Sequence, residues 1–379
     1  MKCLIPNIGS TSFKYRVLSM PEETALANGR VERIGQPGGD CPDYPSAIRK
    51  CIDSIVGEGK ALNSLTEIEA IGFKVVHPGP LVGPRLVDDE LLAQMEDFSF
   101  FAPAHNPPYI AAMKAFRKEL PGVPLVAVFE ITPYAGLSEA ATTYAVPYEW
   151  RTKYGVRRYG FHGASHRSAS ENVVKQISKT GLRHISCHLG GSSSVAAFLD
   201  GVAVDTSFGT SPQSGLPQNN RVGDIDAFAV LFMMKKLGVG PDEMAKLLGS
   251  QSGLAGISGT SGDMRDLEEG AAKGDHRSQL AMDVYVRAVR HYIGSFMVEL
   301  GGVDVISFSG GIGENSPETR SAVCKNLTSF GIELDEAVNS KARTAQTLST
   351  SKSAVKVLII PADEESVVAR ETVRVVQQA

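Results

Sequence analysis

Three stretches of the 379-residue sequence combine glycine with hydroxyl, amide or charged residues in patterns that can hold phosphate. The first is Asn7-Ile-Gly-Ser-Thr-Ser12, which lies between two apolar runs and is followed closely by Lys14. Its glycine lacks a side chain, and its hydroxyl and backbone N–H groups come in close order, so phosphate oxygens can be bound beside a positive charge. Taken alone, the same stretch is also typical of an ordinary surface hairpin.

A second stretch repeats this pattern far along the chain. His188-Leu-Gly-Gly-Ser-Ser-Ser194 also separates an apolar run from an alternating one. Two strand–turn–strand units so far apart predict a duplicated fold with one phosphate-facing hairpin in each lobe, on either side of a cleft.

The third stretch is Ser309-Gly-Gly-Ile-Gly-Glu-Asn-Ser316, between a β-branched run at 303–308 and Pro317. The order predicts a strand, a glycine-rich turn and a helix N-terminus, which is a nucleotide-binding geometry because the backbone can approach the ligand and the helix end favours negative charge. The spacing of its glycines excludes a P-loop and a dinucleotide fingerprint.

Charged and imidazole side chains gather at a few further places. Arg157–His166 holds two arginines, two histidines and two glycines, a composition that predicts the lining of a site rather than a core. A metal site on His162 and His166 stays open, although no third ligand follows and Gly163 opposes a regular helix. Glu130 follows an apolar run and could be a metal ligand, a base or the cap of the following turn. The acidic trio Asp363, Glu364 and Glu365 could stabilise a helix dipole or supply a magnesium ligand.

These residues must be positioned by alternating strands and helices. Apolar runs predict buried strands at 68–76, 124–129, 303–308 and 355–360, and apolar periodicity predicts helices at 49–59, 109–116, 227–237, 279–300 and 364–376. Lys74 and His77 lie near the carboxyl end of the first of these strands, where α/β enzymes place ligand contacts. The irregular stretch 205–226 carries Arg221 and reads as a functional loop.

Composition limits the classes of protein that fit. The chain is 42% hydrophobic and 21% charged, with a formal net charge of −4, which predicts a globular α/β protein of two lobes and no electrostatic footprint for nucleic acid or an anionic membrane. The five cysteines are scattered without a Cys-x-x-Cys pair, so neither a disulfide framework nor a zinc cluster is expected. No signal core or membrane-spanning run is recognisable, and the expected location is the cytoplasm.

Taken together, the motifs resemble those of the acetate kinases, the acetokinase branch of the acetate and sugar kinase, Hsc70 and actin superfamily. The similarity covers essentially the whole chain. The motifs that carry it are Asn7-Ile-Gly-Ser-Thr-Ser-Phe-Lys-Tyr15, Phe101-Ala-Pro-Ala-His-Asn-Pro107, Arg157–His166, Arg221-Val-Gly-Asp-Ile-Asp226, Ser261-Gly-Asp-Met-Arg-Asp266, Gly310-Gly-Ile-Gly-Glu-Asn315 and Pro361-Ala-Asp-Glu-Glu365.

The resemblance implies an α/β protein with two lobes of duplicated ribonuclease-H-like, actin-like topology and an interlobe cleft. Residues 1–146 plus 366–379 would form the N-terminal lobe, and residues 147–365 the C-terminal nucleotide-binding lobe. It implies reversible transfer of a phosphoryl group from ATP to a short-chain carboxylate such as acetate, with Mg²⁺ or Mn²⁺, in a homodimer. A phosphate acyltransferase would be its pathway neighbour. Positioning and charge neutralisation suffice for such chemistry.

The resemblance also implies roles for individual residues. Glu130, His162, Arg221 and His105 would be catalytic. Asn7 and Glu364 would serve the metal. The substrate would contact Lys74, Val76, Ala104, Phe161, Pro212 and Arg221. ATP and its phosphates would contact Ser10, Ser12, Lys14, His188, Gly190, Gly191, Ser192, Asp263, Met264, Arg265, Gly311, Ile312, Gly313 and Asn315.

Several positions depart from the family pattern. The family's His-Arg-Val-Val-His-Gly-Gly is Phe73-Lys-Val-Val-His-Pro-Gly79 here, so an arginine fork is replaced by Lys74. The family's Phe-Asp-Thr-Ala-Phe-His is Phe129-Glu-Ile-Thr-Pro-Tyr134, so an aspartate is replaced by the longer Glu130. Gly191 and Ser192 replace Asn-Gly, and Ser214 replaces a glutamate.

Ala104 stands where a leucine is usual, which predicts a roomier acyl pocket that accepts propionate or a longer acid. Two alternatives stay open at this point: the same fold with another phosphoryl donor such as pyrophosphate, and a nucleotide-binding homologue with impaired catalysis. The shorter cation at 74 and the longer anion at 130 either compensate each other or record relaxed selection.

Overall fold

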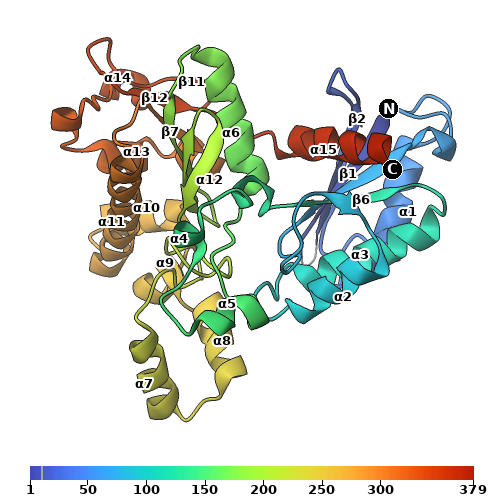
Figure 1. Ribbon diagram of the computed structural model, residues 1–379, viewed down its shortest axis with the longest axis horizontal. Coiled ribbons are helices and arrows are strands. Elements are labelled where there is room, and N and C mark those ends of the chain that lie inside the picture. The colour runs from blue at the N-terminus through green and yellow to red at the C-terminus, as the bar shows by residue number, and fades with distance from the viewer. Residues whose placement is uncertain (10–11) are drawn as a thin grey trace. The chain divides into compact units, whose positions relative to one another are not determined.

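Two sheets of the same topology organise the computed structural model, which describes residues 1–9 and 12–379 (Figure 1). The chain divides into two units, each built around one sheet: unit 1 comprises Met1–Ala135 and Asp363–Ala379, and unit 2 comprises Gly136–Ala362. The strand order is β3-β2-β1-β4-β6-β5 in unit 1 and β9-β8-β7-β10-β12-β11 in unit 2. The predicted duplication is therefore present in the sheets.

The two sheets also share their strand directions. In unit 1, β1, β2 and β3 are antiparallel, β4 and β6 add in parallel to β1, and β5 closes the edge antiparallel. In unit 2, β7 to β12 repeat this arrangement. The strands are β1 Lys2–Ile8, β2 Phe13–Ser19, β3 Thr24–Val31, β4 Ala70–Val75, β5 Arg85–Leu86, β6 Leu125–Phe129, β7 Arg183–His188, β8 Ser194–Leu199, β9 Val202–Thr206, β10 Val305–Ser309, β11 Gln346–Thr347 and β12 Lys356–Ile359.

Helices cover the sheets and carry the connections. Those of unit 1 are α1 Tyr44–Ile55, η1 Leu65–Glu67, α2 Asp89–Asp97, α3 Asn106–Glu119, η2 Thr132–Tyr134 and α15 Glu364–Gln378. Those of unit 2 are α4 Glu139–Thr142, α5 Tyr148–Tyr154, α6 Gly163–Gln176, α7 Ala227–Leu237, α8 Pro241–Ser250, α9 Gly253–Ser258, α10 Met264–Ala272, α11 His276–Glu299, α12 Gly310–Asn315, α13 Pro317–Cys324, η3 Thr328–Phe330 and α14 Glu336–Asn339.

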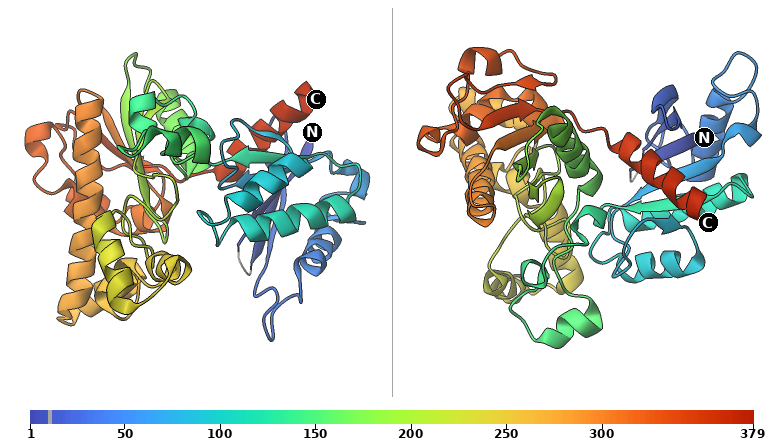
Figure 2. Two further views of the ribbon diagram at one scale, coloured as in Figure 1. Left: turned by 60° about the horizontal axis from the view of Figure 1, so that its bottom comes forward. Right: turned by 45° about the horizontal axis from the view of Figure 1, so that its top comes forward.

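The last helix of the chain belongs to the first unit. Helix α15 follows unit 2 in the sequence but packs on β1, β4 and β6, and Figure 2 shows it beside these N-terminal strands in both views. Its Val368 and Ala369 are buried with Cys3, Ile5 and neighbouring apolar side chains of the sheet. In unit 2, helix α6 packs on β7 and β10 in the corresponding way. Each of these two helices brings its first turn to the carboxyl ends of the parallel strands, where ligand sites form in such folds.

The sequence predicted most elements, with shifts at their ends. Helix α7 has the predicted bounds, and its N-cap Asp226 accepts a hydrogen bond from Phe228 N. The predicted helix 49–59 instead begins earlier, as α1. The glycine-rich stretch after β10 is not a turn, because Gly310–Asn315 forms the short helix α12. Helix α11 covers the predicted helix 279–300 and buries one stripe, which includes Tyr285 and Val289.

The predicted lobe boundaries at 146/147 and 365/366 differ from the observed ones at 135/136 and 362/363. The second difference has a local cause, because Asp363 is the N-cap of α15 and accepts hydrogen bonds from Ser366 N at 3.3 Å and Ser366 Oγ at 2.7 Å. A cap of this kind fixes the residue to its helix. The acidic trio 363–365 therefore belongs to unit 1.

All five cysteines are buried and unpaired, as small core residues. Within the described chain, residues 1–9 and 12–379, we find no helix with the length and apolar character needed to traverse a bilayer.

Candidate active site

A lysine held between two glutamates is the main charged feature of unit 1. Lys74 Nζ lies 3.3 Å from Glu130 Oε1 and 2.5 Å from Glu364 Oε2. The three residues come from the end of β4, the residue after β6 and the first turn of α15. The Glu130 side chain is only 3% exposed, and those of Lys74 and Glu364 are 20% exposed. The cluster is thus a largely desolvated set of two anions and one cation.

Burial and the two carboxylates shift the pKa of Lys74 in opposite directions. Desolvation favours the neutral amine, but the negative charges of Glu364 and Glu130 outweigh it and raise the pKa of Lys74 well above its ordinary value. Lys74 therefore carries its charge at neutral pH. Glu130 directly precedes Ile131, the N-cap residue of η2, and forms an ion pair with Lys74.

The start of α3 and the buried Tyr109 lie near this cluster. Tyr109 on α3 is buried, its hydroxyl accepts a hydrogen bond from Ile8 N at 3.3 Å, and burial raises the pKa of Tyr109 to about 12. His105 is the N-cap residue of α3. The next residue, Asn106, donates from Nδ2 to His77 O at 2.9 Å, which ties the start of α3 to the segment after β4.

The first predicted phosphate hairpin is formed by β1 and β2, with Asn7 opposite Lys14 in the antiparallel register. Gly9 N donates to Ser12 O at 2.8 Å across the turn, and a Cβ on Gly9 would lie 2.5 Å from Ser12 Oγ. A side chain at position 9 would therefore have to displace the hydroxyl of Ser12. Lys14 is exposed and Asn7 half-buried. Ser10 lies outside the described residues.

In unit 2, His162 stands at the start of α6 in a left-handed backbone conformation, with φ of 55°. Its Nδ1 lies 2.8 Å from Ser194 Oγ, in a hydrogen bond. The same hydroxyl is 2.8 Å from His166 Nε2. His162 and His166 therefore share a serine hydroxyl.

The segment 157–166 is more buried than its composition predicted, because α6 begins at Gly163 and takes His166 into the interior. Burial lowers the pKa of His166 well below its ordinary value, with smaller effects of His188 and His184. Residues 1–9 and 12–379, which the structure describes, contain no group of three or more histidine, cysteine or acidic side chains arranged to hold a metal ion. The metal site on His162 and His166 is not supported.

The second predicted phosphate hairpin lies next to the third predicted stretch. A Cβ on Gly190 would be 3.7 Å from Gly311 N, and Ile312 N donates to Leu189 O at 2.8 Å. Gly310 has φ of 78°, and a Cβ there would be 2.6 Å from Leu189 O. The structure thus joins the β7–β8 turn and the N-terminus of α12 into one surface of glycines, in which Gly191 and Gly311 are exposed, whereas Gly313 is buried.

Arg221 reaches this hairpin from its loop. Arg221 Nη1 lies 3.3 Å from Ser192 Oγ and 3.2 Å from Gln218 Oε1, and burial lowers the pKa of Arg221. Asn219 N donates to Gly191 O at 3.2 Å. The loop that carries Arg221 is therefore fixed to the glycine turn by both backbone and side-chain contacts.

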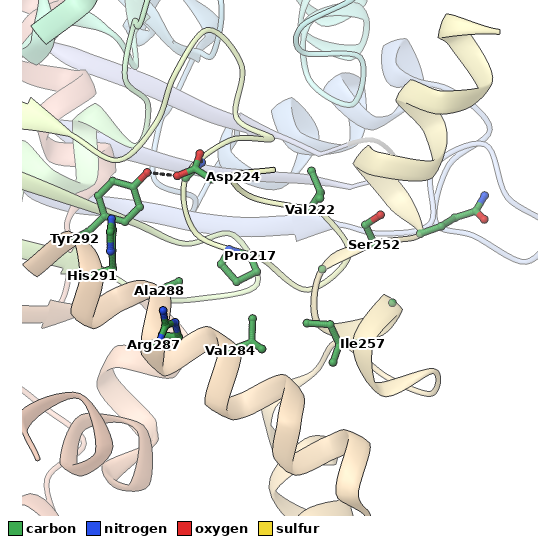
Figure 3. Close-up of a pocket in the computed structure, with 14 residues that line it drawn as sticks. Pro217, Val222, Asp224, Ser252, Ile257, Val284, Arg287, Ala288, His291 and Tyr292 are labelled. Atoms are coloured by element: carbon green, nitrogen blue, oxygen red, sulfur yellow. Dashed lines mark hydrogen bonds between the residues drawn. The ribbon is translucent and has the colours of Figure 1, made fainter. Parts of the chain in front are cut away.

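The far side of this loop is fixed to α11. Asp224 Oδ1 accepts from Gly215 N at 2.8 Å, and Tyr292 donates its hydroxyl hydrogen to Asp224 Oδ2. Figure 3 shows this contact at the edge of a pocket of about 660 Å³ between the loop and α11, which Val284, Arg287 and His291 also line.

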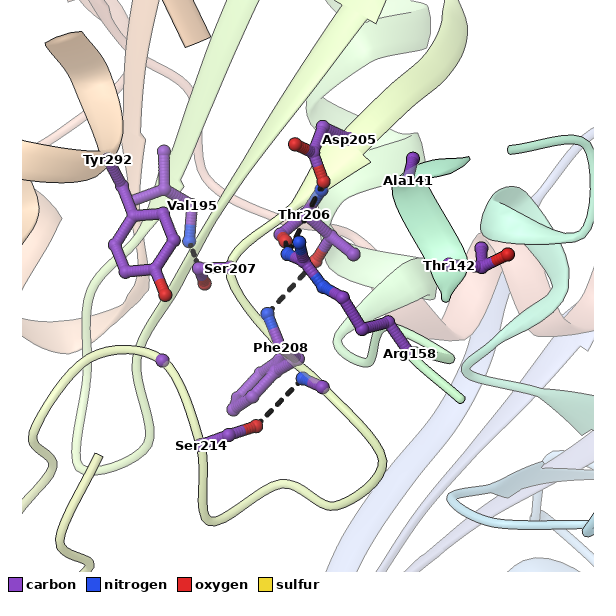
Figure 4. Close-up of polar contacts among 12 residues, drawn as sticks. Ala141, Thr142, Arg158, Val195, Asp205, Thr206, Ser207, Phe208, Ser214 and Tyr292 are labelled. Atoms are coloured by element: carbon purple, nitrogen blue, oxygen red, sulfur yellow. Dashed lines mark hydrogen bonds and ion pairs between the residues drawn. The ribbon is translucent and has the colours of Figure 1, made fainter. Parts of the chain in front are cut away.

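The segment that carries Pro212 is held by a second set of contacts (Figure 4). Val195 N donates to Ser207 Oγ at 3.0 Å, and Gly209 N donates to Ser214 Oγ at 2.7 Å. Arg158 lies 3.4 Å from Asp205 Oδ1 and donates to Thr206 O. Phe161 and Pro212 are buried in this unit, whereas Val76 and Ala104 belong to unit 1, so their grouping into one acyl pocket stays a prediction.

The residues predicted to contact ATP at the start of α10 and in α12 differ in exposure. Asp263 caps α10 and forms an ion pair with the exposed Arg265 at 2.6 Å. Met264 is 4% exposed and Ile312 9% exposed, and both belong to the apolar core of unit 2. A Cβ on Gly262 would lie 2.1 Å from Asn219 O, so this segment packs directly against the Arg221 loop.

Comparison with known proteins agrees with this geometry. The family model described as the acetokinase family matches residues 2–370. The acetate kinase of Shouchella clausii is 39% identical over 391 residues, covering 98% of this chain and 99% of that protein.

The chain belongs to the acetokinase family.

Solved structures extend the family match to the fold. The acetate kinase of Porphyromonas gingivalis superposes with a TM-score of 0.89 at 34% identity and 99% coverage of both chains. A propionate kinase from Francisella tularensis superposes with a TM-score of 0.90 at 30% identity, covering 98% of this chain and 99% of that one. The predicted two-lobed, actin-like α/β fold is confirmed.

Sequence reasoning missed several partners of the acetokinase site residues. Ser186, Gln218 and Tyr109 were not predicted to serve the site, yet they bond His166, Arg221 and the end of β1. One pattern could have revealed part of this set: His184, Ser186 and His188 alternate along β7 and therefore share one face of the sheet.

Proposed function

We propose that this chain catalyses reversible phosphoryl transfer between ATP and a short-chain carboxylate, giving an acyl phosphate. The observation that carries the proposal is the acetokinase match over residues 2–370, which spans both units and therefore both halves of the predicted site. The glycine surface of unit 2 and the desolvated charges of unit 1 support it, because phosphoryl transfer needs positioning and charge stabilisation more than a covalent residue.

The residues of unit 2 suit the phosphate end of ATP. The turn at Gly190 and the N-terminus of α12 offer backbone N–H groups, to which Gly191, Ser192 and Gly311 contribute. Arg221 would neutralise charge that develops on the transferring group, and His162 would donate a hydrogen bond to it. Asp263, Arg265 and Asn315 would border the adenosine.

The residues of unit 1 suit a metal ion bound together with nucleotide phosphates. Magnesium in such sites is held by one or two carboxylates plus phosphate oxygens, so Glu364, Glu130 and the side-chain oxygen of Asn7 fit it without a larger protein cage. When bound, Mg²⁺ or Mn²⁺ neutralises phosphate charge. Lys74 would hold both carboxylates in place and, with His105, act on the substrate. His188, Ser12 and Lys14 would contact phosphates.

The acid accepted by the site is expected to extend beyond acetate. Ala104 leaves more room than a leucine, and a propionate kinase is among the structural relatives. Since each methylene contributes about 1–3 kcal/mol to discrimination, the preference should be graded. We expect kcat/KM for propionate to equal or exceed that for acetate, and a steep preference for acetate would contradict the roomier pocket.

A hydroxamate assay tests the main proposal. With ATP, Mg²⁺ and acetate or propionate, purified protein should form acyl phosphate, and omission of the metal should abolish it. A parallel reaction with pyrophosphate in place of ATP tests whether another phosphoryl donor is used. Binding of ATP without acyl phosphate from any short acid would instead support an impaired homologue.

A homodimer is also proposed. Helix α7 has no buried residue within this chain, and Phe228 is 80% exposed, with Leu231 at 58% and Phe232 at 56%. An apolar surface of this kind is typical of an interface. A second copy of the chain would cover it. A phosphate acyltransferase as pathway neighbour and a cytoplasmic location also stay predictions.

Light scattering coupled to size-exclusion chromatography tests the dimer. We expect wild type to elute as a dimer and Phe228→Asp to shift toward the monomer. Val298→Asp on α11 is the matched control, because Val298 is equally exposed at 80%. A dimer that survives Phe228→Asp combined with Leu231→Asp would rule out α7 as the interface.

A further inference from the structure

A chain of four side chains runs from His162 into the interior of unit 2. His162 Nδ1 bonds Ser194 Oγ at 2.8 Å, Ser194 Oγ bonds His166 Nε2 at 2.8 Å, and His166 Nδ1 bonds Ser186 Oγ at 2.9 Å. Ser194, His166 and Ser186 are completely buried. Because solvent does not reach these three side chains, each of their N–H and O–H hydrogens needs an acceptor within the protein.

Such a chain can point in either of two directions. In one direction, Ser186 donates to His166 Nδ1, His166 donates from Nε2 to Ser194, and Ser194 donates to His162 Nδ1. In the opposite direction, His162 donates from Nδ1 to Ser194, Ser194 donates to His166 Nε2, and His166 donates from Nδ1 to Ser186. The hydroxyl hydrogen of Ser186 then needs an acceptor other than these side chains.

The end at Ser186 decides between the two. Across residues 1–9 and 12–379, the hydroxyl of Ser186 has His166 Nδ1 as its one hydrogen-bond partner. In the opposite direction the hydroxyl hydrogen of Ser186 would be buried without an acceptor, which is the costly arrangement. The first direction gives an acceptor to the hydrogens of all three buried residues, Ser186, His166 and Ser194.

We propose that Ser186, His166 and Ser194 form a one-way hydrogen-bond relay that fixes His162 in the tautomer with its proton on Nε2. Since Nδ1 of His162 accepts from Ser194, a neutral imidazole must carry its hydrogen on the other nitrogen. The three relay residues are positioning residues. They make His162 a hydrogen-bond donor through Nε2 rather than a proton acceptor.

Two further observations agree with the relay. The left-handed backbone at His162, with φ of 55°, sets the ring at the start of α6, where it meets Ser194. The depressed pKa of His166 keeps that ring neutral, as a residue that both donates and accepts must be. Nδ1 of the neighbouring His188 bonds Ser165 Oγ at 2.6 Å, a hydroxyl that is not one of the three relay residues.

The consequence for catalysis rests on the proposed phosphoryl transfer. A donor at Nε2 stabilises negative charge on a phosphoryl oxygen, whereas a lone pair there would repel it. The tautomer itself does not depend on the reaction and can be measured directly.

Nitrogen-15 NMR of the full-length protein labelled at histidine tests the relay. In wild type near neutral pH, we expect His162 and His166 both to show a protonated Nε2 and an unprotonated Nδ1. Assignment uses single His→Gln variants. A wild-type His162 protonated at Nδ1 overturns the proposal, and this measurement needs no relay variant to fold.

Ser186→Ala removes the hydrogen that sets the direction. We expect part of His162 to shift to the Nδ1–H tautomer and kcat to fall by about 10- to 100-fold, as when partners that orient a working histidine are removed, with KM for ATP within about twofold. Ser307→Ala is the control, because Ser307 is a fully buried serine that bonds His184 instead, at 2.8 Å.

An unchanged His162 spectrum in Ser186→Ala overturns the relay, as does an equal change in Ser307→Ala. If the wild-type protein shows the predicted tautomers but forms no acyl phosphate from any acid, the proposed function fails while the relay stands.

Discussion

The two units share a sheet topology but differ in the chemistry they place at its strand ends. Unit 1 gathers full charges, with Lys74 between Glu130 and Glu364. Unit 2 gathers mostly neutral groups, histidines bonded to serine hydroxyls and glycines without side chains, beside the guanidinium of Arg221. The comparison teaches that topology supplies positions, namely a hairpin turn and the ends of parallel strands, while the side chains at those positions diverge independently.

The origin of the key residues follows the same rule in both units. In unit 1, Glu364 is the first residue of α15, and in unit 2, His162 is the N-cap residue of α6. Each helix packs on the parallel strands of its unit, so each delivers a side chain to the same edge of its sheet. Four variants test how far the two units differ.

The largest effect is expected from Lys74→Met in unit 1. It leaves two carboxylates, one of them 3% exposed, without their cation. We expect activity to fall by more than about 100-fold and the free energy of unfolding by about 3 kcal/mol, measured by urea titration. Lys179→Met is the control, because Lys179 is 48% exposed and its ion pair with Asp304 should contribute less than about 1 kcal/mol. Equal losses in both variants would contradict a desolvated cluster.

Lys74→Arg tests whether Lys74 and Glu130 are adapted to each other. The 3.3 Å contact between Lys74 Nζ and Glu130 Oε1 indicates that they are, so a larger guanidinium should crowd the longer carboxylate. We expect kcat/KM to fall by about tenfold in Lys74→Arg, and Lys74→Arg with Glu130→Asp to recover most of it. A single Lys74→Arg variant that is more active than wild type would show instead that Lys74 is a damaged anchor.

Gly310→Ala probes the glycine surface of unit 2. Because Gly310 has φ of 78° and its Cβ would lie 2.6 Å from Leu189 O, we expect a loss of about 1–3 kcal/mol in stability without nucleotide. Gly311→Ala next to it is the matched control, since a Cβ there meets nothing within 4 Å. Similar stability of the two variants would show that the turn is adaptable.

The smallest effect at neutral pH concerns the buried His184 of unit 2, whose contribution changes only in acid. Burial lowers the pKa of His184 to about 3 from 6.5, so below pH 6.5 the unfolded chain binds a proton that the folded chain does not. The stability from this group is present above pH 6.5 and is lost as the pH falls, by about 1.4 kcal/mol per pH unit. We expect His184→Gln to show a shallower acid slope than wild type in urea titrations between pH 6.5 and 4.5. Parallel slopes would contradict a neutral buried imidazole.

Most of the fold could be predicted from the sequence because apolar runs and glycine turns mark strands and their ends locally. The repeat of Asn7–Ser12 at His188–Ser194 correctly indicated a duplication. The region 310–315 was predicted as a glycine-rich turn that lets the backbone approach a ligand, but backbone contacts to Leu189 hold it as α12. Likewise, Gly163 begins α6 instead of opposing it, because a helix start tolerates glycine.

The sequence by itself determined the family, the two hairpins and the residue types available for phosphoryl transfer, since these depend on local spacing and on motifs. Only the tertiary structure decided which groups meet. Lys74 and Glu364 are 290 residues apart in the chain, and their contact exists because α15 returns to the first sheet. The partners of His162 were hidden for the same reason: a serine in a strand gains its role only from the helix that packs over it.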